Sequence, residues 1–599
     1  MLAAVSRRAN LWVAAIAVVI GALYAAMGLA RFTTFHNETF DLAFYARMAW
    51  GLSRGDTWDP IVGANVLGLH LSPVLAPLGL LGRLFGTAQV LLVAQAAAIA
   101  AAAWPLARIG ARRWGDAGAL LGAIAWLAYP NLGHVAAYEA HPGTLAVLPL
   151  AWLADGIDRK CARTIVLSSI AVLACREDLG LVVAMSALLA AAVAPESRRV
   201  TLGLAAASIA YVAAFAIVLH PRFAPARGSF ELHFGKWGTS APSALMYILG
   251  HPAELFAHLT APRRLLYPLL VLGPLALLPL ARARWLLPAL PVLAVNLLSD
   301  FPTTVNLDSH YLTPVLPFLV AGALDGAARV MARLPRMPVR SALGSAVVVS
   351  HVIAAGTPLS FDCPWAMFMR DERTVAAREV VRAVGPDASV QAPYELLAHL
   401  AERPALFFPP PPDKHADVVV LDASHRRRFA HSEDLLRTTE EPRTRRWLAR
   451  GDWQLALAAG DYLVLRRGHD PRAGAGRRYI VGTADPASGT PLTMCLAVLG
   501  ARLTPAALEL ELVAYAPCPN DLAVRVGEGP RPRRVDLLFD GLLSPTHLRR
   551  GDRLRSTHAL SATEHAALVA AGVARVGVLR SSGARPDPAD PMAVDVPLR

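Results

Sequence analysis

The sequence predicts an α-helical polytopic membrane bundle of about eleven transmembrane helices, followed by soluble α/β and β-sandwich-like regions. Of its 599 residues, 55% are hydrophobic and 17% are charged, whereas about 25% of a soluble chain is charged. The mean hydropathy is +0.41. Long apolar runs fill residues 11–357, while charged residues and proline crowd the region after Phe361. This segregation indicates parts that face different solvents.

The first apolar run, Leu11–Ala30, has a spanning length of 20 residues and follows Arg7 and Arg8. The small residues Gly28 and Ala30 are spaced like a signal-peptide cleavage site. More apolar segments follow this one along the chain. We therefore expect an uncleaved first helix whose N-terminus lies in the cytoplasm.

The expected crossings alternate with loops of different charge. They lie at 11–30, 87–108, 117–134, 143–157, 164–175, 179–194, 200–219, 265–281, 285–299, 311–328 and 341–357. Loops that this topology places inside contain arginine, whereas the short outer loops 131–142 and 300–310 contain neither lysine nor arginine. The short loops thus satisfy the positive-inside rule. Two longer outer loops are expected at 31–86 and 220–264.

The stretch Thr164–Ala194 would be about 46 Å long as one helix, longer than the hydrocarbon core of about 30 Å. It is interrupted by Arg176-Glu177-Asp178, and positive loops flank both of its ends. Both ends should therefore lie inside, so the stretch should cross twice and turn at the triplet. Because both halves are short, we expect the triplet below the outer surface, in a protein-lined or wet pocket.

After the eleventh helix the chain is expected to stay outside. The membrane domain would cover residues 1–360, an α/β domain 361–470 and a β-rich domain 471–599. The expected elements are a helix at Thr374–Val384, strands at Ser389–Ala392, Asp417–Leu421 and Tyr462–Leu465, and β-like segments that include Ala507–Tyr515 and Arg534–Phe539. The alternation of short strands with turns after residue 477 predicts a small β-sandwich.

Charge and cysteine content exclude some classes. The net charge of +13 would suit nucleic acid, but much of it lies in short loops where Lys and Arg determine topology. We expect no nucleic-acid partner. The five cysteines lack CxxC spacing and a neighbouring histidine pattern, which disfavours zinc. Cys495 and Cys518 both fall outside the membrane, where a disulfide could form, although their spacing does not support one.

Polar clusters gather on one side of this topology. Ionisable groups are costly in a membrane bundle, and those that persist usually serve function. Five clusters fall on the outer side: Asn37-Glu38-Thr39-Phe40-Asp41, His70-Leu71-Ser72-Pro73, Glu139-Ala140-His141-Pro142, Arg176-Glu177-Asp178 and Asp308-Ser309-His310-Tyr311. We expect them to meet in one pocket that opens away from the cytoplasm.

The first two clusters also have structural interpretations. Asp41 precedes Leu42–Leu52, a plausible amphipathic helix at the interface, and could be only its N-cap. Capping and catalysis are weighed equally for Asp41, and one residue can do both. Ser72 followed by Pro73 suits the start of a helix, which leaves His70 unexplained.

The other clusters are equally open to two interpretations. Pro142 holds His141 extended, so i, i+2 spacing points Glu139 and His141 the same way. This suits a shared metal or proton, or it arises by accident. The arginine triplet could be an ion cluster that holds a helical hairpin, but one arginine cannot neutralise two carboxylates, so a further cation or substrate group is expected. His310 and Tyr311 could face the cavity.

Two arginines are expected at the outer end of the eighth helix. Arg263 and Arg264 lie near Tyr267, and guanidinium groups bind phosphate in a bidentate manner. They could hold the phosphate of a lipid carrier, and contact with anionic lipid headgroups explains them at least as well. The sequence has no GxxxxGK[ST] loop and no GxGxxG motif after a strand, which disfavours a nucleotide-driven pump.

The motifs resemble those of a known family. FDLAFYARMAWG, GLHLSP, EAHP, REDLG and HYLTPVLP resemble the bacterial and archaeal predicted membrane proteins of the family of unknown function numbered 2079; they stand at 40–51, 68–73, 139–142, 176–180 and 310–317. The resemblance covers about residues 35–467, including DVVVLD at 417–422 and GDYLVLRR at 460–467. Arg176 stands where the family more often has lysine. The tail after about residue 475 looks like an addition.

That family is similar to the glycosyltransferase C superfamily, which uses polyprenyl-phosphate-linked sugars and carries an acidic residue in its first outer loop. Asp41, with Glu38 nearby, occupies the matching position. The resemblance therefore implies that Asp41 is the general base. It also implies a glycosyltransferase-C-like fold, a lipid-linked sugar as donor and a cell-envelope glycan, lipid or protein as acceptor. This inference is made at the level of the superfamily.

The first hypothesis is an inverting glycosyltransferase in the cytoplasmic membrane, with Asp41 and Glu38 as catalytic residues. Its substrate contacts would come from His70, Glu139, His141, Arg176, Glu177, Asp178, Arg263, Arg264, His310 and Tyr311. A divalent ion held by the histidines and Glu139 is left open. A transporter is the second hypothesis, because intramembrane acids and histidines also form proton relays. A scaffold that only holds the outer domains in the membrane is the third.

Overall fold

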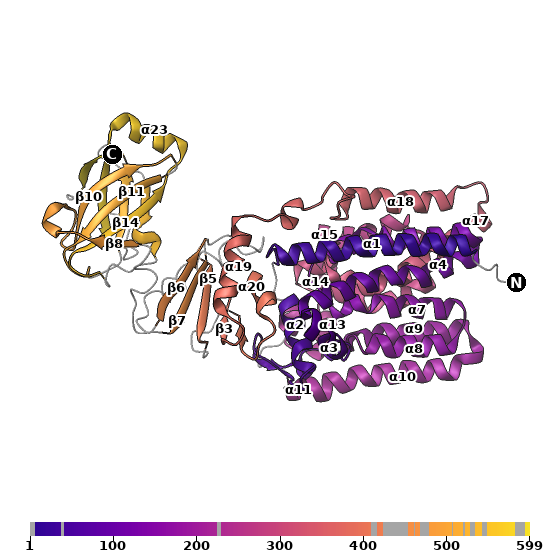
Figure 1. Cartoon of the computed structure of the whole chain (residues 1–599). Helices are drawn as coiled ribbons and strands as arrows, with labels where there is room; N and C mark the ends of the chain where they lie inside the picture. Colours follow the sequence, from indigo (N-terminus) through magenta and orange to yellow (C-terminus); the bar gives the residue numbers. More distant parts are fainter. Residues whose placement is uncertain are drawn as a thin grey trace. The chain divides into compact units, whose positions relative to one another are not determined.

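The chain divides into two compact units (Figure 1). The bundle unit comprises Met1–Asp371 and Tyr394–Phe408, and the C-terminal unit comprises Glu372–Pro393 and Pro409–Arg599. The structure is a computed structural model that describes residues 6–37, 41–223, 229–408, 416–422, 453–460, 462–467, 479–505, 507–518, 522–527, 534–541, 548–580 and 593–599.

Apolar helices build the bundle unit, and the longer ones run roughly parallel to one another in Figure 1. Among the described residues, five helical stretches are long and apolar enough to cross a membrane: Arg7–Thr33 (α1), Thr87–Leu127 (α4), Pro195–Phe223 (η3 to α11), Leu278–Leu298 (η6 and α16) and His310–Arg333 (η8 and α17). A helical, mostly apolar bundle is therefore confirmed. The count of eleven crossings stays a prediction.

Shorter elements complete the bundle unit. Its further helices are α2 (Asp41–Leu52), α3 (Leu75–Phe85), α5 (Pro130–Ala137), α6 (Pro142–Leu145), α7 (Val147–Asp158), α8 (Ala162–Leu173), α9 (Gly180–Val193), α10 (Arg198–Ala214), α12 (Ser229–Phe234), α13 (Ala241–Gly250), α14 (Pro252–Leu259), α15 (Pro262–Leu272), α17 proper (Leu316–Arg333), α18 (Val339–Ala354) and α20 (Tyr394–Leu397). The strands β1 (Trp58–Asp59) and β2 (Ala64–Asn65) form a small antiparallel hairpin.

The stretch assigned to α4 consists of two helical arms joined by a tight reversal. Trp114 and Gly115 depart from helical backbone angles, and Gly115 has a φ of 57°, which glycine adopts without steric cost. The arms then touch, since a Cβ at Gly110 would lie 2.0 Å from the carbonyl oxygen of Gly118. The backbone thus has two helical arms where the sequence predicts two crossings, and the crossings themselves stay a prediction.

The helices α4 and α17 lie inside the bundle, whereas α10 lies at its periphery. In the most apolar part of each stretch, 67% of the residues of Thr87–Leu127 and 72% of those of His310–Arg333 are buried, compared with 11% for Pro195–Phe223. Trp126 on α4 and Phe318 on α17 are fully buried. The apolar side chains that α10 exposes are suited to contact with lipid.

An Arg–Asp network joins α4, α7, α17 and η6 (Leu278–Ala289). For example, Asp155 is fully buried and accepts hydrogen bonds of 2.8 Å from both Arg112 and Arg159. Buried charges persist only when they are paired. The network consists of Asp155, Asp158, Asp325, Arg108, Arg112, Arg113, Arg159, Arg282 and Arg284.

The C-terminal unit begins with an α/β region. The strand β5 (Val418–Asp422) pairs in parallel with β3 (Val390–Gln391) and antiparallel with β7 (Tyr462–Arg467). β6 (Trp453–Ala459) adds to β7, and α19 (Glu372–Val384) packs on β6 and β7. The helix and three of these strands lie where the sequence predicts them, and β6 was not predicted.

Two antiparallel sheets follow, in the orders β8-β14-β11-β10-β9 and β13-β12-β15-β16. A disulfide joins Cys495 to Cys518, at either end of the β10–β11 hairpin. A sheet-rich C-terminal region is thus confirmed. Its elements are β8 (Ile480–Thr483), β9 (Thr490–Pro491), β10 (Leu496–Leu503), β11 (Ala507–Ala514), β12 (Leu522–Gly527), β13 (Arg534–Leu537), β14 (Asp552–Ala559), α23 (Ala562–Ala571), β15 (Val573–Arg580) and β16 (Val594–Pro597).

Candidate functional site

Asp41 is the first residue of α2 and lies beside His141. Its Oδ2 is 3.2 Å from Nε2 of His141, and 28% of its side chain is exposed. The N–H of Leu42 donates to Oε2 of Glu139 at 2.7 Å. The first N–H groups of a helix have no partner within the helix, and here the fully buried Glu139 supplies one. Glu139 therefore caps α2, and a carboxylate oxygen of Asp41 approaches His141.

The ring of His141 is fixed beside Asp41 by its backbone and by Glu139. Pro142 follows His141, whose backbone is extended (φ −131°, ψ 139°), and Nδ1 of its ring is 2.9 Å from the carbonyl oxygen of Glu139. A carbonyl only accepts, so Nδ1 carries a hydrogen. Nε2 and Oδ2 would repel each other at 3.2 Å without a proton. Their approach has the distance of an ion pair but not the alignment of a hydrogen bond.

Aromatic rings surround His141. The ring of His310 stacks on it, with centroids 3.6 Å apart and planes 16° apart. Tyr45 approaches the same ring edge-on at 5.6 Å. Tyr311 lies 4.2 Å from His310. The predicted clusters that contain Asp41, His141 and His310 therefore share one site.

The charged triplet forms the turn between α8 and α9, as predicted. Oε1 of Glu177 lies 2.9 Å from Nδ1 of His70, and its Oε2 accepts from the N–H of Leu71 at 2.8 Å. Nε of Arg176 lies 3.1 Å from Oδ1 of Asp178. His70 is thus a partner for the carboxylate that Arg176 alone could not neutralise.

The interpretation of Ser72 as an N-cap is wrong. α3 begins at Leu75, after Val74, and no side chain caps it. Pro73 and Val74 form a turn ahead of the helix, which separates Ser72 from the first helical N–H groups.

The two neighbouring carboxyl groups of the triplet differ in acidity. Burial raises the pKa of Glu177, but the charge and hydrogen bond of His70 and the charge of Arg176 outweigh it and lower this pKa to about 2. Asp178 differs from Glu177 in that half of its side chain is exposed, and it pairs with Arg176. Glu177 is therefore the carboxylate of this pair that stays anionic to low pH.

Tyr45 links the triplet to Asp41. Its ring lies 5.6 Å from that of His141 and 6.4 Å from that of His70, which pairs with Glu177. All five predicted clusters therefore contribute to one site. We call it the Asp41 cluster; it consists of Asp41, Tyr45, His70, Glu139, His141, Arg176, Glu177, Asp178, His310 and Tyr311.

Other predicted site residues lie differently. Arg264 donates to the carbonyl oxygens of Leu297 at 3.1 Å and Ser299 at 2.6 Å. Arg263 is exposed at the start of α15. Glu38 lies outside the described residues.

Sequence reasoning missed Tyr45 and Gln95. Tyr45 follows Asp41 by four residues, a spacing that places both on one face of a helix. Gln95 is a polar residue in an apolar helix; its Oε1 accepts from the N–H of His141 and its Nε2 donates to the carbonyl of Val135. Both signals are visible in the sequence, because a polar residue inside a membrane helix needs partners.

Few donor atoms are available for a metal ion at this site. Within the described part of the chain, no group of three or more His, Cys, Asp or Glu side chains is arranged to hold a metal ion. Asp41 and His141 present one oxygen and one nitrogen to each other.

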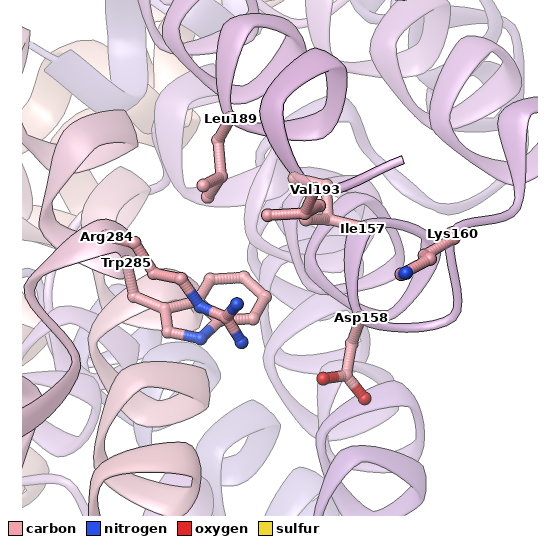
Figure 2. A pocket seen from close by; sticks show the side chains of 7 residues that line it. All are labelled: Ile157, Asp158, Lys160, Leu189, Val193, Arg284 and Trp285. Atoms are coloured by element: carbon pink, nitrogen blue, oxygen red, sulfur yellow. The ribbon is translucent and has the colours of Figure 1, made fainter. Parts of the chain in front are cut away.

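A cavity of about 290 Å³, part of it open to solvent, lies at the Arg–Asp network (Figure 2). It is lined by Ile157, Asp158, Lys160, Leu189, Val193, Arg284 and Trp285. None of these belongs to the Asp41 cluster.

Comparisons with known proteins find a matching family and a similar solved structure. The model of DUF2079, a family of predicted membrane proteins, matches residues 31–451. No curated protein matches the sequence. Among solved structures, the crystal structure of ArnT from Cupriavidus metallidurans bound to undecaprenyl phosphate is similar, with a TM-score of 0.45 and 12% identity, over 77% of this chain and 98% of that chain. The family match includes every residue of the Asp41 cluster.

Proposed function

The chain belongs to the DUF2079 family of predicted membrane proteins, and we propose that it is a membrane glycosyltransferase. It moves a sugar from a polyprenyl-phosphate donor to an acceptor hydroxyl on the outer face of the membrane, with inversion at the sugar. Asp41 is the general base. The observation that carries this proposal is the Asp41–His141 pair, a carboxylate and an imidazole 3.2 Å apart in a cluster that also contains a guanidinium group.

The pair suits proton transfer. When its single proton rests on the ring, His141 is an imidazolium and Asp41 is an anion that can accept the proton of a hydroxyl group. The partly exposed carboxylate is open to an acceptor, and the carbonyl of Glu139 holds the ring in place. A positioned base of this kind contributes roughly 10²- to 10⁴-fold to rate.

The transfer is a single displacement at the anomeric carbon of the sugar. The acceptor oxygen forms a bond to the anomeric carbon, and the bond from that carbon to the phosphate oxygen breaks. The proton goes to Asp41, and the negative charge leaves on the polyprenyl phosphate. Arg176 is the best supported partner for that phosphate, because its Nε makes an ion pair with Asp178 but no hydrogen bond among the described residues, whereas Arg264 already donates to two carbonyls.

Transport by proton relay has weaker support. A relay needs titratable groups at successive depths. Between His141 and Asp155 the sequence contains none, and between Tyr311 and Asp325 it contains none. No titratable side chain of residues 142–154 or 312–324 therefore connects the Asp41 cluster to the Arg–Asp network.

The proposal is tested with Asp41→Asn. We expect sugar transfer from polyprenyl-phosphate sugars in isolated membranes to fall by about 100-fold or more, with protein level and unfolding temperature maintained. Asp308→Asn is the matched control, because Asp308 is an exposed carboxylate close in sequence to His310, and its loss should leave transfer unchanged. Undiminished transfer by Asp41→Asn excludes the base assignment.

A further inference from the structure

The Arg–Asp network contains more positive than negative charge. It has six guanidinium groups and three carboxylates, and Lys160 adds another cation at the cavity. The side chains of Asp155, Asp158 and Asp325 are 0%, 6% and 9% exposed. All three carboxylates are therefore already engaged, and they leave several cations in excess.

Some cations of the network keep donors to spare. Arg282 and Arg284 are 34% and 42% exposed. Nε of Arg282 is buried and approaches Asp325 only at 3.5 Å, without forming a hydrogen bond among the described residues. Cations held together at the edge of an apolar bundle favour an anion that reduces their mutual repulsion.

The cavity has the chemistry of a lipid headgroup site. Figure 2 shows Arg284 and Lys160 approaching it from opposite sides. Ile157, Leu189 and Val193 give it apolar walls. The path along the chain from His141 to Asp158, mostly helical, corresponds to roughly 25 Å at 1.5 Å per residue, so this site is separate from the Asp41 cluster.

We propose that this cavity binds the phosphate of an anionic membrane lipid. Arg284 and Lys160 hold the phosphate oxygens, since guanidinium groups suit phosphate geometry and an ammonium adds a point charge. The apolar walls contact the glycerol and the first methylene groups. Because the arginine-rich loops are expected on the cytoplasmic side, this lipid belongs to the cytoplasmic leaflet. The site is independent of the proposed sugar transfer.

Lys160→Gln tests the proposal, because Lys160 takes no part in the network. Its backbone is left-handed, with a φ of 56°, and the conformational cost of that backbone is similar for lysine and glutamine. The purified full chain is titrated with phosphatidylglycerol or phosphatidylcholine in a nonionic detergent, and bound lipid is counted by native mass spectrometry. We expect phosphatidylglycerol to bind more tightly than phosphatidylcholine, and Lys160→Gln to weaken it about fivefold. The control Arg336→Gln, an exposed cation after α17, should have no effect.

Several outcomes overturn this assignment. They are equal binding of the two lipids, equal losses in Lys160→Gln and Arg336→Gln, and complete displacement of phosphatidylglycerol by millimolar inorganic phosphate. The last would make free phosphate the ligand. Unfolding temperatures measured without lipid check that both variants fold, and Arg284→Gln gives a second reduction in binding if the phosphate lies where we place it.

Discussion

Glu139 holds the start of α2 in place. It is fully buried, and its Oε2 accepts the N–H of Leu42 at 2.7 Å, so it fixes the first turn of α2 and with it the place of Asp41. A glutamine keeps an acceptor oxygen there, whereas an alanine leaves a buried N–H unpaired, at a cost of about 1–3 kcal/mol.

We therefore expect Glu139→Gln to keep most of the transfer activity, and Glu139→Ala to lose roughly 10- to 100-fold because Asp41 moves. The unfolding temperature should fall only in Glu139→Ala. Sugar-transfer assays and thermal unfolding of both variants check this. A carboxylate that bound metal or moved protons would lose activity equally in both.

The lowered pKa of Glu177 predicts that the stability of the fold decreases at acidic pH. The pKa of Glu177 is lowered from its ordinary 4.5 to about 2, against the effect of burial, mainly by His70. Because the folded pKa is the lower one, this group contributes stability above about pH 4.5, and that contribution is lost as pH falls towards 2. Unfolding temperature in detergent should therefore drop over this window.

His70→Asn removes the main cause of the lowered pKa, so its unfolding temperature should start lower at neutral pH and fall less steeply below pH 4.5. Parallel curves for the wild type and the variant would show that Glu177 does not depend on His70.

At the scale of elements, one segment packs against the end of α1. Tyr394–Phe408 belongs to the bundle unit, although the residues on both of its sides belong to the C-terminal unit. His399 lies between Phe32 and Phe35, with ring centroids 3.9 Å apart in both pairs. Phe32 belongs to the last turn of α1, and Phe35 follows the helix, six residues before Asp41. The segment thus fixes the end of α1, from which the chain continues to α2.

His399→Ala removes two stacked contacts, each worth about 0.5–1.5 kcal/mol. We expect a lower unfolding temperature and reduced sugar transfer. His251→Ala is the control, because His251 also stacks on an aromatic ring, Tyr247, at 4.0 Å, but at an exposed site. Equal effects of the two substitutions would mean that the position of His399 has no special importance for the site.

The turns of the bundle differ in how well the sequence predicts them. The turn at Glu177 could be predicted because charged residues interrupt an apolar run that is too long for one crossing. The start of α3 could not, because Ser72 and Pro73 satisfy the local pattern of a helix start. The backbone between Ser72 and Leu75 instead forms a turn, and Ser72 is buried there.

Over the whole molecule, the sequence predicts that distant motifs meet in one site, but it does not predict which contacts each residue makes there. Membrane topology alone places Asp41, His141 and His310 at the same end of the bundle. The bond between Leu42 and Glu139 spans 97 positions of sequence, so no local pattern shows that Glu139 caps α2. The same holds for the 107 positions that separate His70 from Glu177.

The orientation of the chain in the membrane is testable through its cysteines. Cys495 and Cys518 form a disulfide in the C-terminal unit, while Cys161, Cys175 and Cys363 of the bundle unit are free. Disulfides persist in oxidising compartments, so this pair supports the extracytoplasmic C-terminus that the arginine-rich loops predict. The 23-residue separation corresponds to about 3 kcal/mol of stabilisation through the unfolded state.

We expect a membrane-permeant maleimide, added to intact cells before lysis and denaturation, to leave Cys495 and Cys518 unlabelled until a reductant is added. Mass spectrometry of the labelled peptides measures this, and serine at both positions should lower the unfolding temperature of the C-terminal unit. Labelling without a reductant would place that unit in a reducing compartment. Because α18 leads into it from the bundle, the Asp41 cluster would then face the cytoplasm, and sugar transfer on the outer face would have to be abandoned.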